Sequence, residues 1–255
     1  MNKDIALGLL GLAFGGALIC FPASAQEPAV TPYRPTVSNP ADLPAPGFLE
    51  SEFGALSGKG GGFRRRDSIP VLLKYGFTEN AGLLFGGEGR VRLTGNDGER
   101  AEGGGDSVLL LKLRHPLTKK AALGLEAGYK FATAKKEIGS GKNDAIMNGI
   151  ASIELNGWQI DANLGVTRLG LETTGESRHA YNLSLAAAHA IAQDWNAAAE
   201  VSGVSQKGVP VTSQYLMALA YSFSKTIVLD CGAAWGLSRA ATDRQVFAGM
   251  SVLWK

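Results

Sequence analysis

The sequence predicts an all-β fold: an antiparallel up-and-down transmembrane β-barrel of about 12 strands that follows a cleaved signal peptide. Three observations support this fold. Apolar residues alternate with small or polar ones, this pattern repeats along the chain, and the connections between the repeats alternate between short and long. Side chains alternate faces along a strand, and a closed barrel leaves no unpaired edge in lipid.

The clearest alternation lies in residues 213–237, which read as two strands joined by a Ser-Lys-Thr turn. Tyr215 and Met217 share one face of the first strand, and Leu229 and Trp235 share one face of the second. The intervening positions are mostly small or polar. Each strand is close to the length, about 9–11 residues, that a tilted strand needs to cross a bilayer. This stretch therefore predicts a membrane-spanning hairpin with one lipid-facing side.

Residues 1–25 have the features of a signal peptide: an early lysine, an apolar run, and small residues at Ala23 and Ala25 that fit a cleavage site. Cys20 would be removed with this peptide. Cys231 is then the single cysteine of the mature chain, so an internal disulfide is excluded.

Residues 26–46 contain six prolines. Proline lacks a backbone N–H and fixes φ, so this density excludes regular strands and helices. Two interpretations remain: an extended periplasmic lead, which we favour, or a plug that enters the barrel lumen. Regular alternation begins at Gly47, so the barrel is expected to occupy residues 47–255.

From Gly47 onward each expected strand has one apolar face. The approximate strand ranges are 47–57, 63–77, 81–94, 106–117, 121–133, 143–155, 157–168, 179–191, 195–206, 211–223, 226–238 and 244–254. Connections after even-numbered strands are short, as at 156–157 and 224–225, whereas 95–105 and 134–142 are longer and polar. Outer-membrane barrels have short periplasmic turns and longer extracellular loops, so both chain ends are expected at the short-turn rim.

Three stretches read LPAPGFLESEFG (43–54), IPVLLKYGFTENAGL (69–83) and YSFSKTIVLDCGAAWGL (221–237). Together they resemble an outer-membrane transporter family linked to the meta-cleavage pathway of phenol degradation. The resemblance implies a porin-like barrel in the outer membrane of a Gram-negative bacterium, a role in transport, and the outer-membrane assembly machinery as a partner. One departure is that Lys255 follows Trp254, where such barrels usually end on an aromatic residue.

Charged residues on the faces turned away from lipid would line the lumen. Basic candidates gather on the second to fourth strands, whereas most acidic candidates lie on other strands, beginning with Glu50 and Glu52. The other lumen candidates are Arg64, Arg66, Lys74, Glu88, Arg90, Arg92, Lys112, Arg114, Glu126, Asp161, Glu200 and Asp230. They would either polarise a hydrated pore or form a salt-bridge network that packs a narrow lumen.

The sequence does not indicate catalytic, cofactor-binding or metal-binding residues. His115 and His189 fall near the short-turn rim with outward parity, where an interfacial role is expected. His179 lies close to Ser177, but no third residue is placed to orient it and no G-x-S-x-G motif is present. No cluster has metal-ligand spacing, and the glycine runs lack the Lys-Ser/Thr of a phosphate loop. A formal net charge of +2 does not indicate a nucleic-acid partner.

The expected function is passive passage of small solutes, aromatic or hydrophobic ones among them, through a barrel surrounded by membrane lipid. The substrate class rests on the resemblance alone. Two alternatives remain open. One is a non-conducting structural barrel. The other is an outer-membrane lipid-modifying hydrolase, for which Ser177 or His179 would be essential.

Overall fold

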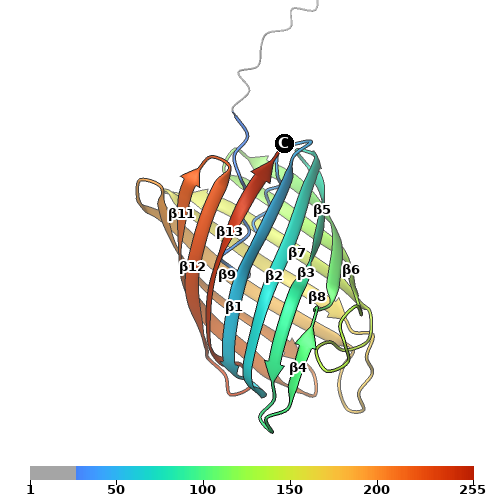
Figure 1. The fold of residues 1–255 in the computed structure, drawn as a ribbon. Coiled ribbons are helices and arrows are strands. Elements are labelled where there is room, and N and C mark those ends of the chain that lie inside the picture. The colour runs from blue at the N-terminus through green and yellow to red at the C-terminus, as the bar shows by residue number, and fades with distance from the viewer. Residues whose placement is uncertain (1–26) are drawn as a thin grey trace, which may run out of the picture.

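The computed structural model describes residues 27–255, which form a closed antiparallel β-barrel around an N-terminal coil (Figure 1). The expected signal peptide, residues 1–25, lies outside the described residues and stays a prediction. The strands are β1 (Leu49–Gly60), β2 (Phe63–Thr78), β3 (Ala81–Thr94), β4 (Arg100–Gly103), β5 (Ser107–Thr118), β6 (Ala121–Phe131), β7 (Asp144–Leu155), β8 (Trp158–Arg168), β9 (His179–Ala192), β10 (Trp195–Gln206), β11 (Val209–Ser224), β12 (Ile227–Gly236) and β13 (Thr242–Trp254). In residues 27–255 no helix is long and apolar enough to cross a membrane.

The barrel closes because β1 pairs with β13, from Leu49 opposite Trp254 to Gly60 opposite Thr242. Along the rest of the sheet each spanning strand pairs with its neighbours in the chain. The short β4 pairs with β3 and extends that hairpin beyond the barrel wall, so 12 of the strands form the wall. The predicted barrel is therefore confirmed, whereas β4 falls within a stretch predicted to be a loop.

Adjacent residues on one strand show which face meets lipid. Leu111 and Leu229 expose 45% and 36% of their surface, whereas the next residues, Lys112 and Asp230, expose 0% and 7%. A protein in water would bury the leucines and solvate the charges. The reverse order is favourable in a bilayer, where apolar side chains face lipid and polar ones face the lumen. The alternation predicted for residues 213–237 is confirmed by this pattern.

The two rims of the barrel differ, as predicted. Tight turns such as Asn156–Gly157 lie at the rim where β13 ends, and both residues of this turn have positive φ, 51° and 81°. Positive φ at both central positions is what a two-residue hairpin turn requires, and Asn and Gly tolerate it. Aromatic pairs lie near this rim, including Trp158 stacked on His189 with ring centroids 4.7 Å apart. The longer loops gather at the opposite rim (Figure 1).

The N-terminal coil does not hang free of the barrel. Residues 27–48, called here the lumen segment, enter at the short-turn rim and turn back inside the wall (Figure 1). At the rim Val30 N–H donates to the Lys225 carbonyl at 2.8 Å, and Gly47 N–H donates to the Gly76 carbonyl at 2.8 Å. The favoured expectation of a periplasmic lead is therefore wrong for the described part of this segment, which lies in the lumen.

Candidate functional site

Carboxylates on the barrel wall accept hydrogen bonds from the backbone of the lumen segment. Glu50 accepts from Thr31 N–H at 2.9 Å. Glu52 accepts from Tyr33 N–H at 2.7 Å and from Arg34 N–H at 3.1 Å. A proline-rich segment forms no ladder of its own, yet its buried N–H groups still need acceptors. The lumenal acids supply them.

The same arrangement continues on the far wall of the barrel. Glu200 on β10 accepts from the N–H groups of Val37 and Ser38 at 2.8 and 2.7 Å. Asn39 and Asn163 exchange two hydrogen bonds of 2.9 and 2.8 Å, which join the segment to β8. The segment is therefore held from several sides of the wall.

Lys74 is the centre of a buried ion cluster. Its Nζ lies 2.6 Å from Glu50 Oε1 and 2.5 Å from Glu52 Oε1, and it donates to the Thr31 carbonyl at 2.6 Å. Lys74 and both glutamates are buried. A buried cation is tolerated when carboxylates and carbonyls surround it in this way. Lys74 thus joins β1, β2 and the lumen segment.

Tyr33 lies between two lysines, with its ring 3.7 Å from Lys74 Nζ and 4.0 Å from Lys112 Nζ. Cations over an aromatic face are attracted by its negative charge density. The Tyr33 hydroxyl donates to the Asp42 carbonyl at 2.7 Å, which ties the two arms of the segment together. Burial raises the pKa of the Tyr33 phenol well above its ordinary value, and the carboxylate of Glu126 raises it further, so Tyr33 stays a neutral donor.

Lys112 and Glu126 form the second buried ion pair, with Nζ and Oε1 3.0 Å apart. Lys112 also donates to the Pro40 carbonyl at 2.5 Å. Both Glu126 oxygens accept from Asn39 Nδ2 at 3.0 Å. Each member of the pair is thereby hydrogen-bonded to the lumen segment as well as to its partner.

Arg34 makes a two-point contact with Asp230 on β12, with Nη2 2.9 Å from Oδ1 and Nε 3.0 Å from Oδ2. The guanidinium lies against the facing glycines Gly54 and Gly249 of β1 and β13. A Cβ at Gly249 would lie 2.6 Å from Arg34 Nε. These glycines leave the space that a planar guanidinium needs beside the wall.

Several of the predicted lumen candidates therefore face the interior and contact the lumen segment, directly or through one further residue. Asp161 accepts from Ser152 Oγ at 2.5 Å, and Ser152 Oγ in turn accepts from Ala41 N–H. Arg114 Nε lies 2.8 Å from Asp42 Oδ1. The candidates that meet the segment in this way are Lys74, Lys112, Arg114, Glu126, Asp161, Glu200 and Asp230.

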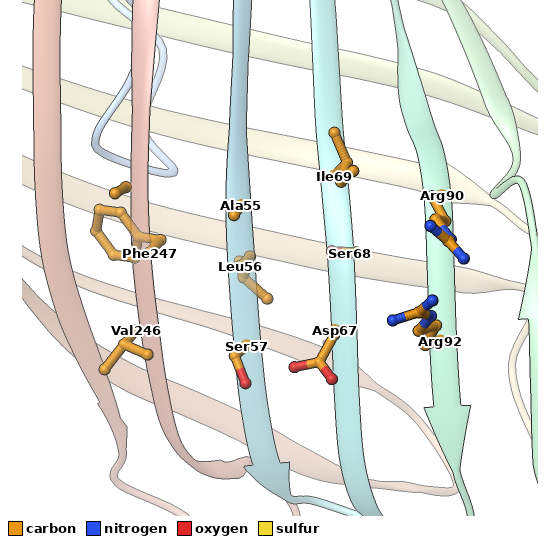
Figure 2. A pocket seen from close by; sticks show the side chains of 11 residues that line it. Ala55, Leu56, Ser57, Asp67, Ser68, Ile69, Arg90, Arg92, Val246 and Phe247 are labelled. Carbon is orange, nitrogen blue, oxygen red and sulfur yellow. The ribbon is translucent and has the colours of Figure 1, made fainter.

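The predicted basic wall on β2 and β3 is wrong in part, because Arg90 and Arg92 face outward. Ile69 pairs with Arg90 but Pro70 pairs with Glu88, so Gly89 is an extra residue in β3. A β-bulge of one residue shifts the side chains that follow it to the opposite face. Beyond the bulge Val91 is buried inside, and Figure 2 shows Arg90 and Arg92 on β3 beside Asp67 of β2.

The remaining basic candidates lie near the long-loop rim. Arg66 retains the inward face and pairs with Glu88, with Nη2 2.5 Å from Oε2. Arg64 is exposed and shares the parity of Arg66 close to the start of β2. The candidates on β2 and β3 therefore do not form one continuous basic surface.

A cavity of about 370 Å³ lies in the loop-side half of the lumen. Val37 of the lumen segment lies on one side of it, and Asn182, Ser202 and Gln214 of the wall are among its other lining residues. All the described residues that line it are uncharged. On the short-turn side a second cavity of about 300 Å³ is lined by Thr31 and other segment residues, together with charged side chains. The lumen segment thus contributes to the walls of both cavities.

Sequence reasoning missed the contribution of the lumen segment itself, above all Tyr33, Arg34 and Asn39. One signal was present: the predicted lumen held acids such as Glu200 and Asp230 with no predicted basic lumen residue on the neighbouring strands. Buried carboxylates need partners, and the proline-rich segment is where such partners were available.

Ser177 and His179 meet through the backbone of the histidine. Ser177 Oγ accepts from the backbone N–H of His179 at 3.0 Å, so the contact does not involve the imidazole. A nucleophile and its base must share a side-chain hydrogen bond. Within residues 27–255 no group of three or more His, Cys, Asp or Glu side chains is placed to hold a metal ion.

Comparisons with solved structures place the fold among bacterial outer-membrane channels. The COG4313 outer membrane channel from Pseudomonas putida F1 is similar over 83% of this chain and 97% of its own, with a TM-score of 0.64 and 13% identity. The KdgM porin is similar over 81% and 99%, with a TM-score of 0.58 and 9% identity. The NanC porin is similar over 80% and 98%, with a TM-score of 0.55 and 9% identity. A search of the curated proteins found no match.

A closed 12-stranded barrel with an apolar, lipid-facing exterior is the form of a bacterial outer-membrane protein, as predicted. The sequence over residues 38–254 matches the family described as "Putative MetA-pathway of phenol degradation". This range includes all the wall strands, so the chain belongs to that family.

Proposed function

We propose that this barrel is a passive channel for small uncharged solutes, aromatic ones among them. The observation that carries the proposal is the loop-side cavity, because all its described lining residues are uncharged and several are amides or hydroxyls. Ligand sites with apolar walls and a few polar groups suit small solutes that carry both kinds of surface. The outer-membrane channels and porins that share the fold support a channel role in general.

In this proposal the lumenal charges hold the lumen segment and do not select the solute. Lys74 and Lys112 are buried in ion pairs, so a passing solute does not meet them while the segment stays in place. A solute that crosses from the loop-side cavity to the short-turn side must pass the lumen segment or displace it. Conductance should therefore depend on how firmly the segment is held.

The proposal can be tested by flux into liposomes that contain the purified full-length barrel. Benzyl alcohol and benzoate are of similar size but differ in charge, so their relative uptake reports charge selection. Benzyl alcohol also crosses bare lipid, so uptake by barrel-free liposomes is subtracted for each probe. We expect faster barrel-dependent uptake of the neutral probe. A Thr212→Asp substitution places a carboxylate in the cavity lining and should lower benzoate uptake further, whereas Thr174→Asp, in the exposed loop after β8, should not.

Equal uptake of both probes would remove charge selection from the proposal. If neither probe enters faster than into barrel-free liposomes, in the wild type and in variants that release the lumen segment, the result would favour the non-conducting structural barrel.

A further inference from the structure

The outer wall of the barrel carries a groove that the channel function does not use. The groove has a volume of about 470 Å³ and is formed by β1, β2, β3 and β13 (Figure 2). Ala55, Ser57 and Ala248 line it with small side chains. Ile69 and Val246, which are both exposed, also line it. A shallow groove that faces lipid and is lined by small and apolar side chains has the dimensions and chemistry to hold an acyl chain.

Two arginines border this groove at a defined height. Arg90 and Arg92 are the tenth and twelfth residues of β3, counted from Ala81 at the short-turn rim. At about 3.3 Å per residue and a tilt near 40°, they lie about 23 to 28 Å from that rim. The apolar band of such barrels is about 25 Å tall, so both guanidinium groups are at its far edge, on the side of the long loops. In outer-membrane barrels this is the level of the outer-leaflet headgroups.

The groove lies within a wider basic surface on the same outward face. Five cationic side chains point outward from these four adjacent strands, and we call them the rim patch: Lys59, Arg65, Arg90, Arg92 and Arg244. Two carboxylates share this face, Asp67 beside Arg65 and Glu102 beside Arg90 and Arg92. Cations therefore outnumber the carboxylates of this face.

One pair in the rim patch is unfavourable as it stands. Lys59 on β1 lies directly opposite Arg244 on β13, both are exposed, and neither forms an ion pair with another described residue. Like charges opposite each other on neighbouring strands repel. An anion bound between them would remove this repulsion.

The arginines beside the groove also keep donors free. Glu102 accepts from Nε and Nη2 of Arg90 and from Nε of Arg92. Nη1 of Arg90 and both terminal nitrogens of Arg92 have no hydrogen-bond partner among the described residues. Guanidinium groups bind phosphate oxygens through paired N–H groups of this kind.

We propose that the rim patch and its groove bind a phosphorylated glycolipid of the outer leaflet, with a phosphate on Arg90 and Arg92 and an acyl chain along Ala55 and Ala248. The apolar groove explains the acyl chain, the excess of cations explains the phosphate, and the height of the arginines explains the outer leaflet. A free anion would leave the groove unused, and a soluble protein partner would not reach a groove that faces lipid.

The test uses full-length barrel in neutral detergent and measures binding of bis-phosphorylated lipid A by native mass spectrometry. The comparison probes are the same lipid without its phosphates and inorganic phosphate. We expect the phosphorylated lipid to bind the wild type, and Arg90→Gln/Arg92→Gln to weaken it about tenfold. Lys119→Gln/Lys120→Gln, a matched pair of exposed cations at the opposite rim, should leave binding unchanged.

An Ala55→Phe variant keeps every arginine but fills the groove, and it should weaken binding of the lipid to a similar extent. This variant and the dephosphorylated lipid keep the test decisive if the double arginine variant does not fold. Equal binding of the dephosphorylated lipid, unchanged binding in Ala55→Phe, or full displacement of the lipid by millimolar inorganic phosphate would each overturn the proposal.

Discussion

The guanidinium of Arg34 and the carboxylate of Asp230 are joined by two hydrogen bonds between residues 196 positions apart in the chain. Asp230 is buried on the wall, and Arg34 belongs to the lumen segment. The contact therefore ties the lumen segment to the barrel wall. Because a solute must pass this segment in the proposed channel, the ion pair is a natural place to test whether the segment controls conductance.

Asp230→Asn should release the lumen segment while the barrel stays closed. Loss of one partner from a buried ion pair costs about 3–5 kcal/mol. This cost is removed if Arg34 moves out of the lumen together with the segment, so the substitution favours release of the segment. We expect hydrogen exchange in peptides that cover residues 27–48 to accelerate about 100-fold or more, together with higher single-channel conductance. Arg114→Gln breaks the more exposed pair with Asp42 and should cost only about 0–1 kcal/mol. Similar effects in both variants would contradict this ranking.

Tyr33→Ala should also loosen the segment, because the ring fills the space between Lys74 and Lys112. Truncation of a buried aromatic side chain costs about 3–5 kcal/mol. Val37→Ala is the matched control, since Val37 lies on the same segment but is exposed, and its truncation should cost less than about 0.5 kcal/mol. The measurement is hydrogen exchange of the segment in both variants. Equal exchange rates would show that Tyr33 does not anchor it.

The sequence could predict the barrel because the wall strands repeat one local rule along most of their length. The alternation at Leu229 and Asp230 is a property of neighbouring residues, and the turn at Asn156 has a local signature as well. Two features of the structure depend on contacts between distant parts of the chain, and the sequence did not predict them. The bulge at Gly89 adds one residue to β3 relative to its partner strand, so the side chains of Arg90 and Arg92 turn to the outer face of the barrel. The alternation of residue types in the sequence does not change at this point. The only hint was the glycine-rich stretch before it.

The position of the lumen segment was a second non-local feature. Its proline content excluded regular structure but did not indicate which surface it would meet. Its partners come from eight wall strands, from Glu50 on β1 to Asp230 on β12. These contacts form only when the barrel closes, so no residue spacing in the sequence predicts them.

Leu111→Arg should destabilise the barrel by about 2–4 kcal/mol if Leu111 lies near the bilayer midplane. Leu171→Arg provides the control, because Leu171 has nearly the same exposure, 44%, but belongs to the loop after β8 and should tolerate charge. The measurement is the free energy of unfolding in guanidinium with lipid vesicles present. If the two substitutions cost the same, the outward face of β5 does not meet lipid.

The orientation in the membrane can be checked with single cysteines in a Cys231→Ala background. Asp97→Cys and Ser140→Cys lie in the loops at the long-loop rim, and Lys119→Cys lies in a short turn. With long loops outside the cell, an impermeant thiol reagent should label the first two on intact cells and the third only after lysis. Labelling of Lys119→Cys alone would reverse the orientation.

Gly249→Ala should act through Arg34, because the added Cβ would lie 2.6 Å from its Nε. The same Cβ would also meet the Phe53 carbonyl oxygen at 2.6 Å, so some loss of barrel stability is expected as well. The control is Gly149→Ala, where the nearest atom to a new Cβ is 3.7 Å away. If Gly249→Ala displaces Arg34 from Asp230, it should raise conductance as Asp230→Asn does. The double variant should then raise it no further than either single change, since two substitutions that break one contact are not additive. Additive increases would mean that the glycine and the aspartate act on different parts of the lumen, and the ion pair would no longer account for how the segment is held.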